Sequence, residues 1–338
     1  MAWKPVMPKL YIKEYGQTLK GRIIVIAARE GIFRDNFTDI INDIKFLNRF
    51  QVRTVLFHNI SNRFANRKHF AEMETRLPQT RIIRVPADRD FYRYVLNFQE
   101  RMDKIIFLER KFLIDHRNER INALNTQKTR ECIQTYRDLI ANTNFKGIIE
   151  QICRKIDTGD IERVHILPAG KKTIRCELFS IEGSGTLIAN NFAETFEPVR
   201  THEDLRMISD ILKIYRRLGL IKPRSMGYLE EHQDNFYLVK IDGILVGCAE
   251  KIQIDNRTVE LGALAISTKF RNQRVGIFLI NTFMTEMKQQ GYKKIISLTA
   301  NPRLESLYGF LGFETGCPPE LEPRQALSPG KKMFVKRL

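Results

Sequence analysis

Residues 259–300 contain the pattern that most restricts the fold of this chain: an apolar strand, a basic turn, a helix and another strand. The strand VELGALAIS leads into the turn Arg271-Asn-Gln-Arg-Val-Gly276, and apolar residues then recur at helical spacing over 277–290. Backbone N–H groups at the start of a helix have no partner within the helix and attract anions. Arginines and a glycine at this point fit a phosphate-binding turn, although a capped surface loop explains the turn equally well when it is taken alone.

The segments around this pattern extend it into an α/β unit that begins near Glu194. Two apolar runs within 235–254 flank Asp242-Gly243, a dipeptide that favours a hairpin turn. Thr201, followed by acidic residues in THEDL, marks the start of a helix. After the helix over 277–290 we expect a strand in KKIISLTA, a short helix through LESLYGFLGF and a basic tail, KKMFVKRL.

The N-terminal half begins with a β-α-β pattern, the seed of a parallel sheet. The strand IIVIAA precedes a glycine turn, apolar residues at helical spacing occupy 37–50, and VRTVLFH forms the next strand. RIIRVP at 81–86 predicts a third strand and 88–156 a mostly helical region. VHILPAG, TIRCELFS and GTLIANN predict short strands at the end of this half.

Length and composition limit the class of protein. The 338 residues are enough for two domains, which we place at 1–190 and 191–338. The sequence contains no apolar run long enough for a membrane helix and begins without the apolar segment of a secretory signal. Its five cysteines are scattered without a CxxC pair, which favours reduced thiols in a cytoplasmic protein and argues against a metal site.

The formal net charge of +17 is concentrated in the first domain. Residues 1–190 hold 34 Lys and Arg against 22 Asp and Glu, whereas 191–338 hold 22 against 17. Such a charge attracts nucleic acid, anionic membranes or acidic small molecules. Because acidic and basic residues alternate, as in FLERKFLIDHRNER, we favour a solvated helical surface and expect no membrane partner. Nucleic-acid binding stays a less favoured alternative.

The order of hairpin, strand, basic turn, helix, strand and short helix resembles the GNAT acyltransferase superfamily over 194–338. The resemblance implies acetyl-CoA as co-substrate and no metal. The family's turn signature falls on Arg271 to Gly276, with Arg274 in place of its first glycine, and implies that backbone N–H groups there surround the CoA pyrophosphate. Tyr308 lies four residues before Gly312, and Asn301 lies at the position that contacts pantetheine. The residues implied as cofactor-binding are Leu264, Ala265, Ile266, Arg271, Gln273, Arg274, Val275, Gly276, Ile277, Phe278 and Asn301.

The resemblance also implies direct acetyl transfer without a covalent intermediate. Glu260, a carboxylate in an apolar strand, is the expected base that takes a proton from the amine, since partial burial would raise its pKa. A surface Glu on an edge strand is the alternative. A main-chain N–H within 264–266 would stabilise the oxyanion, and Tyr308 would protonate the departing thiolate.

A closer resemblance is to the amino-acid N-acetyltransferases that make N-acetylglutamate, in which an amino-acid-kinase-like domain precedes a GNAT domain. RVHILPAGKKTIRCELFSIEGSGTLIANN and LGLIKPRSMGYLEEHQDNF carry this resemblance. It implies an α/β fold: a reduced, non-catalytic, kinase-like three-layer α/β/α domain followed by a GNAT α/β domain. It also implies that Arg224 and Ser225 bind the carboxylate of an amino-acid substrate. In the tail LSPGKKMFVKRL we identify no equivalent of the Arg and Ser that bind substrate in several family members.

The expected activity is therefore acetylation of the α-amine of an amino acid, most simply glutamate, in arginine biosynthesis. The first domain lacks the glycine clusters that hold ATP phosphates. Glu177 and Gly183 match two positions of the family's arginine effector site, and the same domain is the expected site of any homo-oligomer. Two alternatives stay open: a GNAT enzyme acting on another amine, such as that of a protein or an RNA-linked amino acid, or a non-catalytic CoA-binding regulator.

Overall fold

The computed structural model describes residues 10, 12–62, 72–114, 120–135, 148–180, 183–190, 194–241, 244–267, 270 and 275–338. The chain divides into two compact units, 1–192 and 193–338. Both units have an α/β architecture, as expected from the sequence. Within the described residues, no helix combines the length and the apolar character needed to cross a bilayer.

The described residues of unit 1 form a seven-stranded sheet in the order β3-β2-β1-β4-β6-β7-β5. The five strands from β3 to β6 are parallel, and β7 runs antiparallel to β6. Parallel strands are covered on both faces and therefore read as continuous apolar runs, as IIVIAA does in β1. The bounds are β1 (Ile23–Ala28), β2 (Arg53–His58), β3 (Thr80–Arg84), β4 (Met102–Glu109), β5 (Ala123–Asn125), β6 (Ile161–Pro168) and β7 (Thr186–Ala189).

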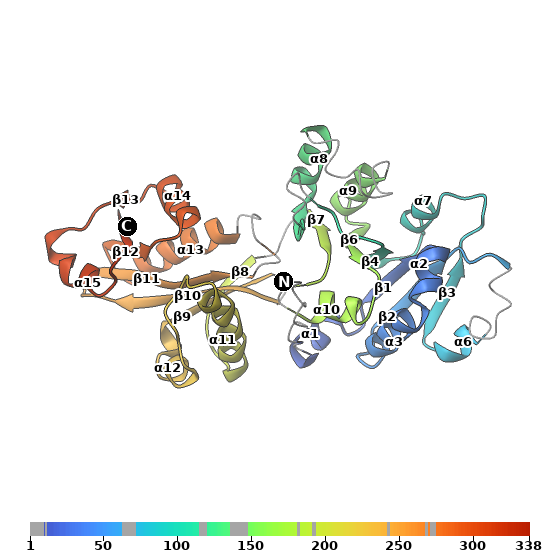
Figure 1. Cartoon of the computed structure of the whole chain (residues 1–338), viewed down its shortest axis with the longest axis horizontal. Helices are drawn as coiled ribbons and strands as arrows, with labels where there is room; N and C mark the ends of the chain where they lie inside the picture. Colours follow the sequence, from blue (N-terminus) through green and yellow to red (C-terminus); the bar gives the residue numbers. More distant parts are fainter. Residues whose placement is uncertain are drawn as a thin grey trace, which may run out of the picture. The chain divides into compact units, whose positions relative to one another are not determined.

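Helices cover both faces of this sheet, which gives the expected three layers (Figure 1). One layer holds α1, α3 and α10, and the other holds α7, α8 and α9. Phe57 and Phe107 of the sheet pack with Val95 of α7 and Ile152 of α9 in a fully buried core. The bounds are α1 (Ile12–Leu19), α2 (Glu30–Asp35), α3 (Phe37–Asn48), α6 (Met73–Arg76), α7 (Phe91–Leu96), α8 (Thr126–Thr135), α9 (Ile149–Asp157) and α10 (Thr173–Phe179).

Two sequence predictions for unit 1 are wrong. The region 88–156, expected to be mostly helical, contains β4, which lies between β1 and β6 in the sheet. The segment TIRCELF, expected to be a strand, is helix α10. The backbone N–H of Ile174 in its first turn donates to Asp43 Oδ2 of α3 at 3.0 Å. This cap comes from 131 residues away, so local sequence does not reveal it.

Unit 2 follows the sequence prediction closely. Its described residues form a seven-stranded sheet in the order β13-β14-β12-β11-β10-β9-β8. Thr201 caps the first helix in a capping box with Asp204, as the THEDL pattern indicated. The strands are β8 (Glu194–Pro198), β9 (Phe236–Ile241), β10 (Ile244–Gln253), β11 (Thr258–Ile266), β12 (Lys294–Thr299), β13 (Glu314–Thr315) and β14 (Lys332–Arg337).

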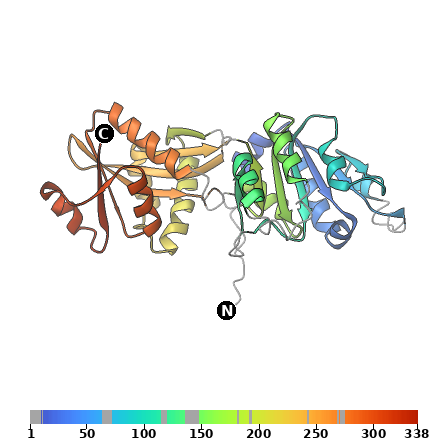
Figure 2. The same ribbon diagram turned by 90° about the horizontal axis from the view of Figure 1, so that it is seen from above.

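Helices α11 and α12 cover one face of this sheet, and α13 and α14 cover the other (Figure 1). Seen from above, α13 lies across the strands (Figure 2). The basic tail, left unassigned by its sequence, is strand β14 and pairs with β12. The helices are α11 (His202–Arg217), α12 (Met226–Glu231), α13 (Val275–Gln289), α14 (Pro302–Phe310) and α15 (Glu322–Ala326), with short 3-10 turns at Gln233–Asn235 and Pro319–Leu321.

Candidate active site

The site lies where two neighbouring parallel strands of unit 2 separate. Strands β11 and β12 pair only from Thr258 to Glu260, opposite Lys294 to Ile296. Beyond this point the ladder stops, and Ser297 Oγ donates a hydrogen bond to the carbonyl of Leu261 at 3.0 Å across the opening. Since a strand edge without a neighbour keeps its backbone donors and acceptors, this opening offers β11 as a binding edge.

A β-bulge bends β11 at the same place. Its register with β10 shifts between Cys248 and Glu250, and Ala263 has a φ of +43°. A positive φ is uncommon for a residue other than glycine, and bulges are frequent beside active sites. The bulge therefore increases the curvature of β11 within the opening.

A cavity of about 70 Å³ occupies the opening. Its walls are β11 from Glu260 to Leu264, β12 from Ser297 to Thr299, and side chains of the loop after α11 and of the C-terminal segment. Burial and neighbouring Lys222 lower the pKa of Lys331 at its mouth. The charged lining residues are Lys222, Arg224, Glu260, Arg324 and Lys331, so positive charge predominates.

Glu260 forms a bidentate ion pair with Arg324. Arg324 Nε lies 2.6 Å from Oε2 and Nη2 lies 2.7 Å from Oε1. Glu260 is 4% exposed, so the alternative of a surface Glu is wrong. Both oxygens of the expected base are already bound, and the base role stays a prediction.

Arg324 was not predicted as a site residue. The tail of the sequence showed no equivalent of the Arg and Ser that bind substrate in the family. Arg324 precedes that tail, on α15, and its Nη1 donates to Ser328 Oγ within the tail at 3.0 Å. The spacing of Arg324 and Ser328 by four residues in EPRQALS was the signal available.

Arg224 has a partner that the sequence did not reveal. Its Nε and Nη2 donate to Glu250 Oε2 at 3.0 and 2.6 Å, and Tyr228 Oη donates to Oε1 of the same carboxylate. Glu250, on β10, is 1% exposed. Burial, followed by the bond to Glu250, raises the pKa of Tyr228 to about 12. Arg224 still lines the cavity, so its contact with a substrate carboxylate stays a prediction.

Ser225, expected to bind substrate, caps a helix instead. Its Oγ accepts a hydrogen bond from the Tyr228 N–H at 3.1 Å as the N-cap of α12. Unlike Arg224, it is absent from the cavity lining. Ser225 thus fixes the start of α12 next to Arg224, and its contact with substrate stays a prediction.

Tyr308 reaches the cavity from α14. Its side chain is 1% exposed, and its Oη lies 2.8 Å from Ser297 Oγ. Burial raises the pKa of Tyr308 to about 12, and the charge of Glu260 adds to the shift. Tyr308 therefore carries its proton at neutral pH, as a proton donor must.

The turn before α13 is described only in part. Arg271, Gln273 and Arg274 lie outside the described residues. Val275, Gly276, Ile277 and Phe278 form the first turn of the 15-residue helix α13. A Cβ added to Gly276 would meet only a side-chain carbon of Leu307, at 3.6 Å. The fold itself leaves space at this glycine, and the CoA contact stays a prediction.

Two other expected cofactor contacts are engaged within the chain. Asn301 caps α14, with its Oδ1 accepting from the Arg303 N–H at 3.0 Å. The N–H of Ile266 donates to Tyr215 Oη at 3.2 Å, and Tyr215 Oη donates to the Ile266 carbonyl at 2.7 Å. Ile266 is therefore not free for the expected oxyanion contact in this state, whereas Leu264 lines the cavity.

Glu177, at the expected effector position in unit 1, forms hydrogen bonds within the chain. Glu177 Oε1 lies 2.8 Å from His165 Nδ1, and Oε2 accepts from the N–H groups of Ser184 at 2.6 Å and Gly185 at 3.0 Å. Gly183 adopts a φ of +62° in the same loop. The Glu177 carboxylate thus holds this loop together, and arginine binding at this position stays a prediction.

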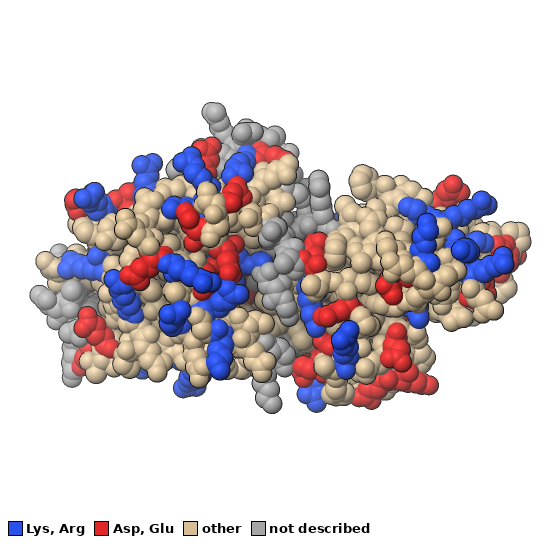
Figure 3. All heavy atoms as spheres, turned by 180° about the vertical axis from the view of Figure 1, so that it is seen from behind, with Lys and Arg blue, Asp and Glu red and all other residues tan. Residues whose placement is uncertain are grey.

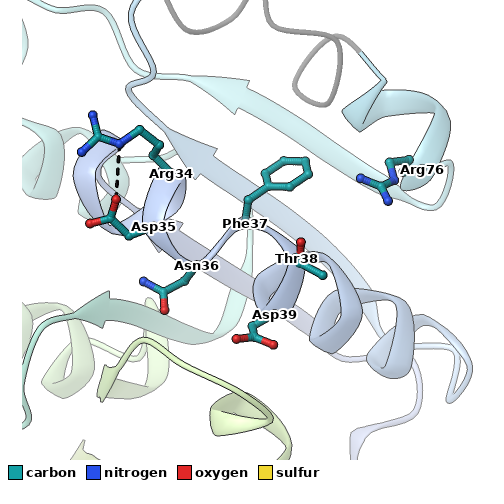
Figure 4. A pocket seen from close by; sticks show the side chains of 7 residues that line it. All are labelled: Arg34, Asp35, Asn36, Phe37, Thr38, Asp39 and Arg76. Atoms are coloured by element: carbon teal, nitrogen blue, oxygen red, sulfur yellow. Dashed lines mark hydrogen bonds and ion pairs between the residues drawn. The ribbon is translucent and has the colours of Figure 1, made fainter.

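A larger cavity, of about 280 Å³, lies at the junction of α2 and α3 (Figure 4). Its charges balance, with Arg34 and Arg76 against Asp35 and Asp39. Arg34 is paired with Asp35 at 3.3 Å, and the Arg76 guanidinium lies 5.8 Å from the Phe37 ring. The smaller cavity of unit 2 has the acid–base groups and the excess of one charge, so we assign the active site there.

Acidic and basic side chains are mixed on one face of the molecule (Figure 3). On the face shown in Figure 3, Lys and Arg are interspersed with Asp and Glu in both units. Such mixing is typical of a solvated surface. In the described residues, no group of three or more His, Cys, Asp or Glu is arranged to hold a metal ion.

Comparison with known proteins identifies unit 2. Residues 193–313 match the acetyltransferase (GNAT) family. The match thus covers most of unit 2, which spans 193–338. The opening between β11 and β12 and the bulge of β11 lie within the matched residues.

Relatives extend the similarity into unit 1. An amino-acid acetyltransferase of Pseudomonas fluorescens (strain Pf0-1) is 28% identical over 67% of this chain and 52% of its own length. An amino-acid acetyltransferase of Aeromonas salmonicida (strain A449) is 26% identical over 58% of this chain and 45% of its own. The chain thus spans about half the length of the curated relatives it matches.

A solved structure matches both units of the fold. N-acetylglutamate synthase from Neisseria gonorrhoeae, complexed with coenzyme A and L-arginine, superposes with a TM-score of 0.51 at 17% identity. The match covers 97% of this chain and 98% of that one. It shows a fold shared over both units and supports the expected α/β fold class.

Proposed function

We propose that the protein transfers the acetyl group of acetyl-CoA to the α-amine of an acidic amino acid, with glutamate as the best candidate. The observation that carries this proposal is the excess of cations around the opening between β11 and β12. Lys222, Arg224, Arg324 and Lys331 line the cavity, against Glu260 in the wall and Glu250 behind it. Glutamate brings two carboxylates and one amine, which matches this charge.

The opening and the first turn of α13 fit the co-substrate. The edge of β11 can pair with the amides of the pantetheine arm, and the N–H groups of 275–278 can face the pyrophosphate. Bound acetyl-CoA would supply the activated acetyl group. The chain's own residues bind and orient both reactants and move the protons.

Proton transfer falls to two side chains in the cavity wall. Glu260 takes the proton of the ammonium, directly or through a water molecule, so that the amine can attack the thioester carbonyl. Tyr308, which is protonated at neutral pH, gives its proton to the departing thiolate. Because Ser297 donates its hydroxyl proton to the Leu261 carbonyl, Tyr308 donates to Ser297 Oγ, and its hydroxyl turns from Ser297 to the thiolate in this step.

In this proposal, the ion pair with Arg324 makes the activity of Glu260 as a base depend on a carboxylate of the substrate. A proton on Glu260 removes its negative charge and so weakens both of its bonds to Arg324. A substrate carboxylate offers Arg324 a replacement partner of the same kind. An amino acid without a second carboxylate leaves the ion pair closed and the base occupied.

We also propose a wider role for the protein. The relatives are named amino-acid acetyltransferases, and the product N-acetylglutamate would serve arginine biosynthesis. The described cysteines Cys153, Cys176, Cys248 and Cys317 are free thiols, which fits the cytoplasm. We propose unit 1 as a non-catalytic domain and as the contact surface of any homo-oligomer.

Product analysis tests the proposed function. Purified protein is incubated with acetyl-CoA and each common amino acid, and free CoA and acetylated products are measured by mass spectrometry. We expect N-acetylglutamate as the main product, with weaker acetylation of aspartate. CoA release with none of the amino acids would contradict the proposal, and so would a preference for basic or neutral amino acids.

A further inference from the structure

The backbone of Ile266 points into the opening between β11 and β12. The N–H of Ser267, the next residue, donates to the Val246 carbonyl of β10 at 2.6 Å. Successive backbone groups of a strand point alternately to its two sides. The N–H and carbonyl of Ile266 therefore point away from β10, toward the side on which pairing with β12 has stopped at Glu260.

One hydroxyl occupies both of these groups. Tyr215, near the end of α11, accepts from the Ile266 N–H at 3.2 Å and donates to the Ile266 carbonyl at 2.7 Å. A hydroxyl can do both at once because it is a donor and an acceptor. It thus makes the pair of bonds that a neighbouring extended chain would make with the same residue.

The pantetheine arm of CoA is such an extended chain, with two amides, and it can add to a free strand edge as a further strand would. We propose that the Tyr215 hydroxyl is a displaceable substitute for a pantetheine amide at Ile266. It covers the strand edge in the absence of CoA and leaves when CoA binds. This inference rests on the proposed function, because it takes CoA as the ligand of the opening.

The alternative is that Tyr215 only fastens α11 to the sheet. The two roles predict opposite effects of removing the hydroxyl. If the Tyr215 hydroxyl competes with CoA for the Ile266 backbone, removing the hydroxyl strengthens CoA binding. If the hydroxyl only holds α11 against β11, removing it leaves the affinity for CoA unchanged or lowers it.

Isothermal titration with CoA separates the two roles. We expect Tyr215→Phe to bind CoA about five- to tenfold more tightly than wild type, the scale of one net hydrogen bond. Tyr237→Phe is the matched control, because it removes a hydroxyl that accepts a hydrogen bond from Gln290 Nε2 at 2.8 Å and does not line the cavity. It should bind CoA as wild type does. If Tyr215→Phe fails to fold, Tyr215→Leu removes the hydroxyl and gives the same comparison.

Hydrogen exchange gives a readout that does not require CoA. Without CoA, the Ile266 amide should exchange faster in Tyr215→Phe than in wild type, and CoA should restore its protection. CoA binding by wild type with no gain in affinity in the variant would overturn this inference alone. Absence of CoA binding by wild type would overturn the proposed function and this inference with it. Equal exchange of the Ile266 amide in the two proteins without CoA would show that Tyr215 does not cover it.

Discussion

Arg324 binds both carboxylate oxygens of Glu260, with Nε–Oε2 and Nη2–Oε1 distances of 2.6 and 2.7 Å. The pair joins α15 to β11 across 64 residues of sequence. The wall of the candidate active site therefore holds a carboxylate whose charge is paired with Arg324. A substrate carboxylate that competes for Arg324 would release Glu260 at the moment the base is needed.

Removing the cation of this pair should destabilise unit 2. Arg324→Gln leaves the 4% exposed Glu260 without a partner, a change that costs about 3 kcal/mol of unfolding free energy in comparable buried pairs. Urea unfolding measures the loss, with Arg303→Gln on the exposed face of α14 as control. The double variant Glu260→Gln/Arg324→Gln should recover part of it. Equal stability of Arg324→Gln and wild type would contradict the pair.

Variants of the proposed base, Glu260, and of the proposed acid, Tyr308, should differ in how kcat depends on pH. Glu260→Gln should lower kcat about 10²- to 10⁴-fold at neutral pH and recover partly at high pH, where the amine is already free. Tyr308→Phe should lower kcat without this recovery, because its defect lies in the departure of the thiolate. Steady-state rates across the pH range measure both. Full activity of Glu260→Gln at every pH would remove the base assignment.

The turn before α13 should bind the pyrophosphate. Gly276→Asp introduces a side chain and a negative charge there, and we expect CoA binding to weaken at least about tenfold. The fold has room for the change, since a Cβ at Gly276 meets only Leu307 at 3.6 Å. Gly31→Asp is the matched control in unit 1, at a helical glycine with nothing within 4 Å. Wild-type affinity in a folded Gly276→Asp would exclude this turn as the pyrophosphate site.

Unit 1 should lose stability in mild acid through His58. Burial, followed by the charge of Arg84, lowers the pKa of His58 from 6.5 to about 4. The folded state therefore binds this proton less readily than the unfolded state does. The contribution of neutral His58 to the free energy of unfolding is complete above pH 6.5. It falls by up to about 3 kcal/mol as the pH drops to 4.

His58→Phe keeps the stacking on Phe33 and removes the titration, so its unfolding free energy should fall less than that of wild type between pH 6.5 and 4. Asp43 titrates in the same window with the opposite sign, because burial raises its pKa to about 6. The difference between the two proteins isolates His58. Parallel curves for wild type and His58→Phe would contradict the assignment.

The sequence was informative where local pattern decides structure. The capping box at Thr201, the hairpin of β9 and β10 and the helix over 275–289 all follow from nearby residues. It failed where partners are distant. The segment of β4 is a strand because it packs between β1 and β6 in the sheet. The segment of α10 is a helix whose first turn is capped by Asp43.

The same limit applies to the site. Glu260 and Tyr308 were found by pattern, and the structure brings both to one cavity. Ion pairing is a long-range property, so the pairs Arg324–Glu260 and Arg224–Glu250 could not be predicted. Tyr215 carried no sequence signal, because a single tyrosine near a helix end fits many environments.

The central claim is that the cationic cavity selects a substrate with a second carboxylate, and the ratio of kcat/KM for glutamate to that for glutamine tests it most directly. The two amino acids have nearly the same shape and differ by one charge. A charge-assisted contact is worth about 1.5–3 kcal/mol, so we predict a preference for glutamate of at least about tenfold and up to a few hundredfold. A ratio near one, or a preference for glutamine, would contradict the account.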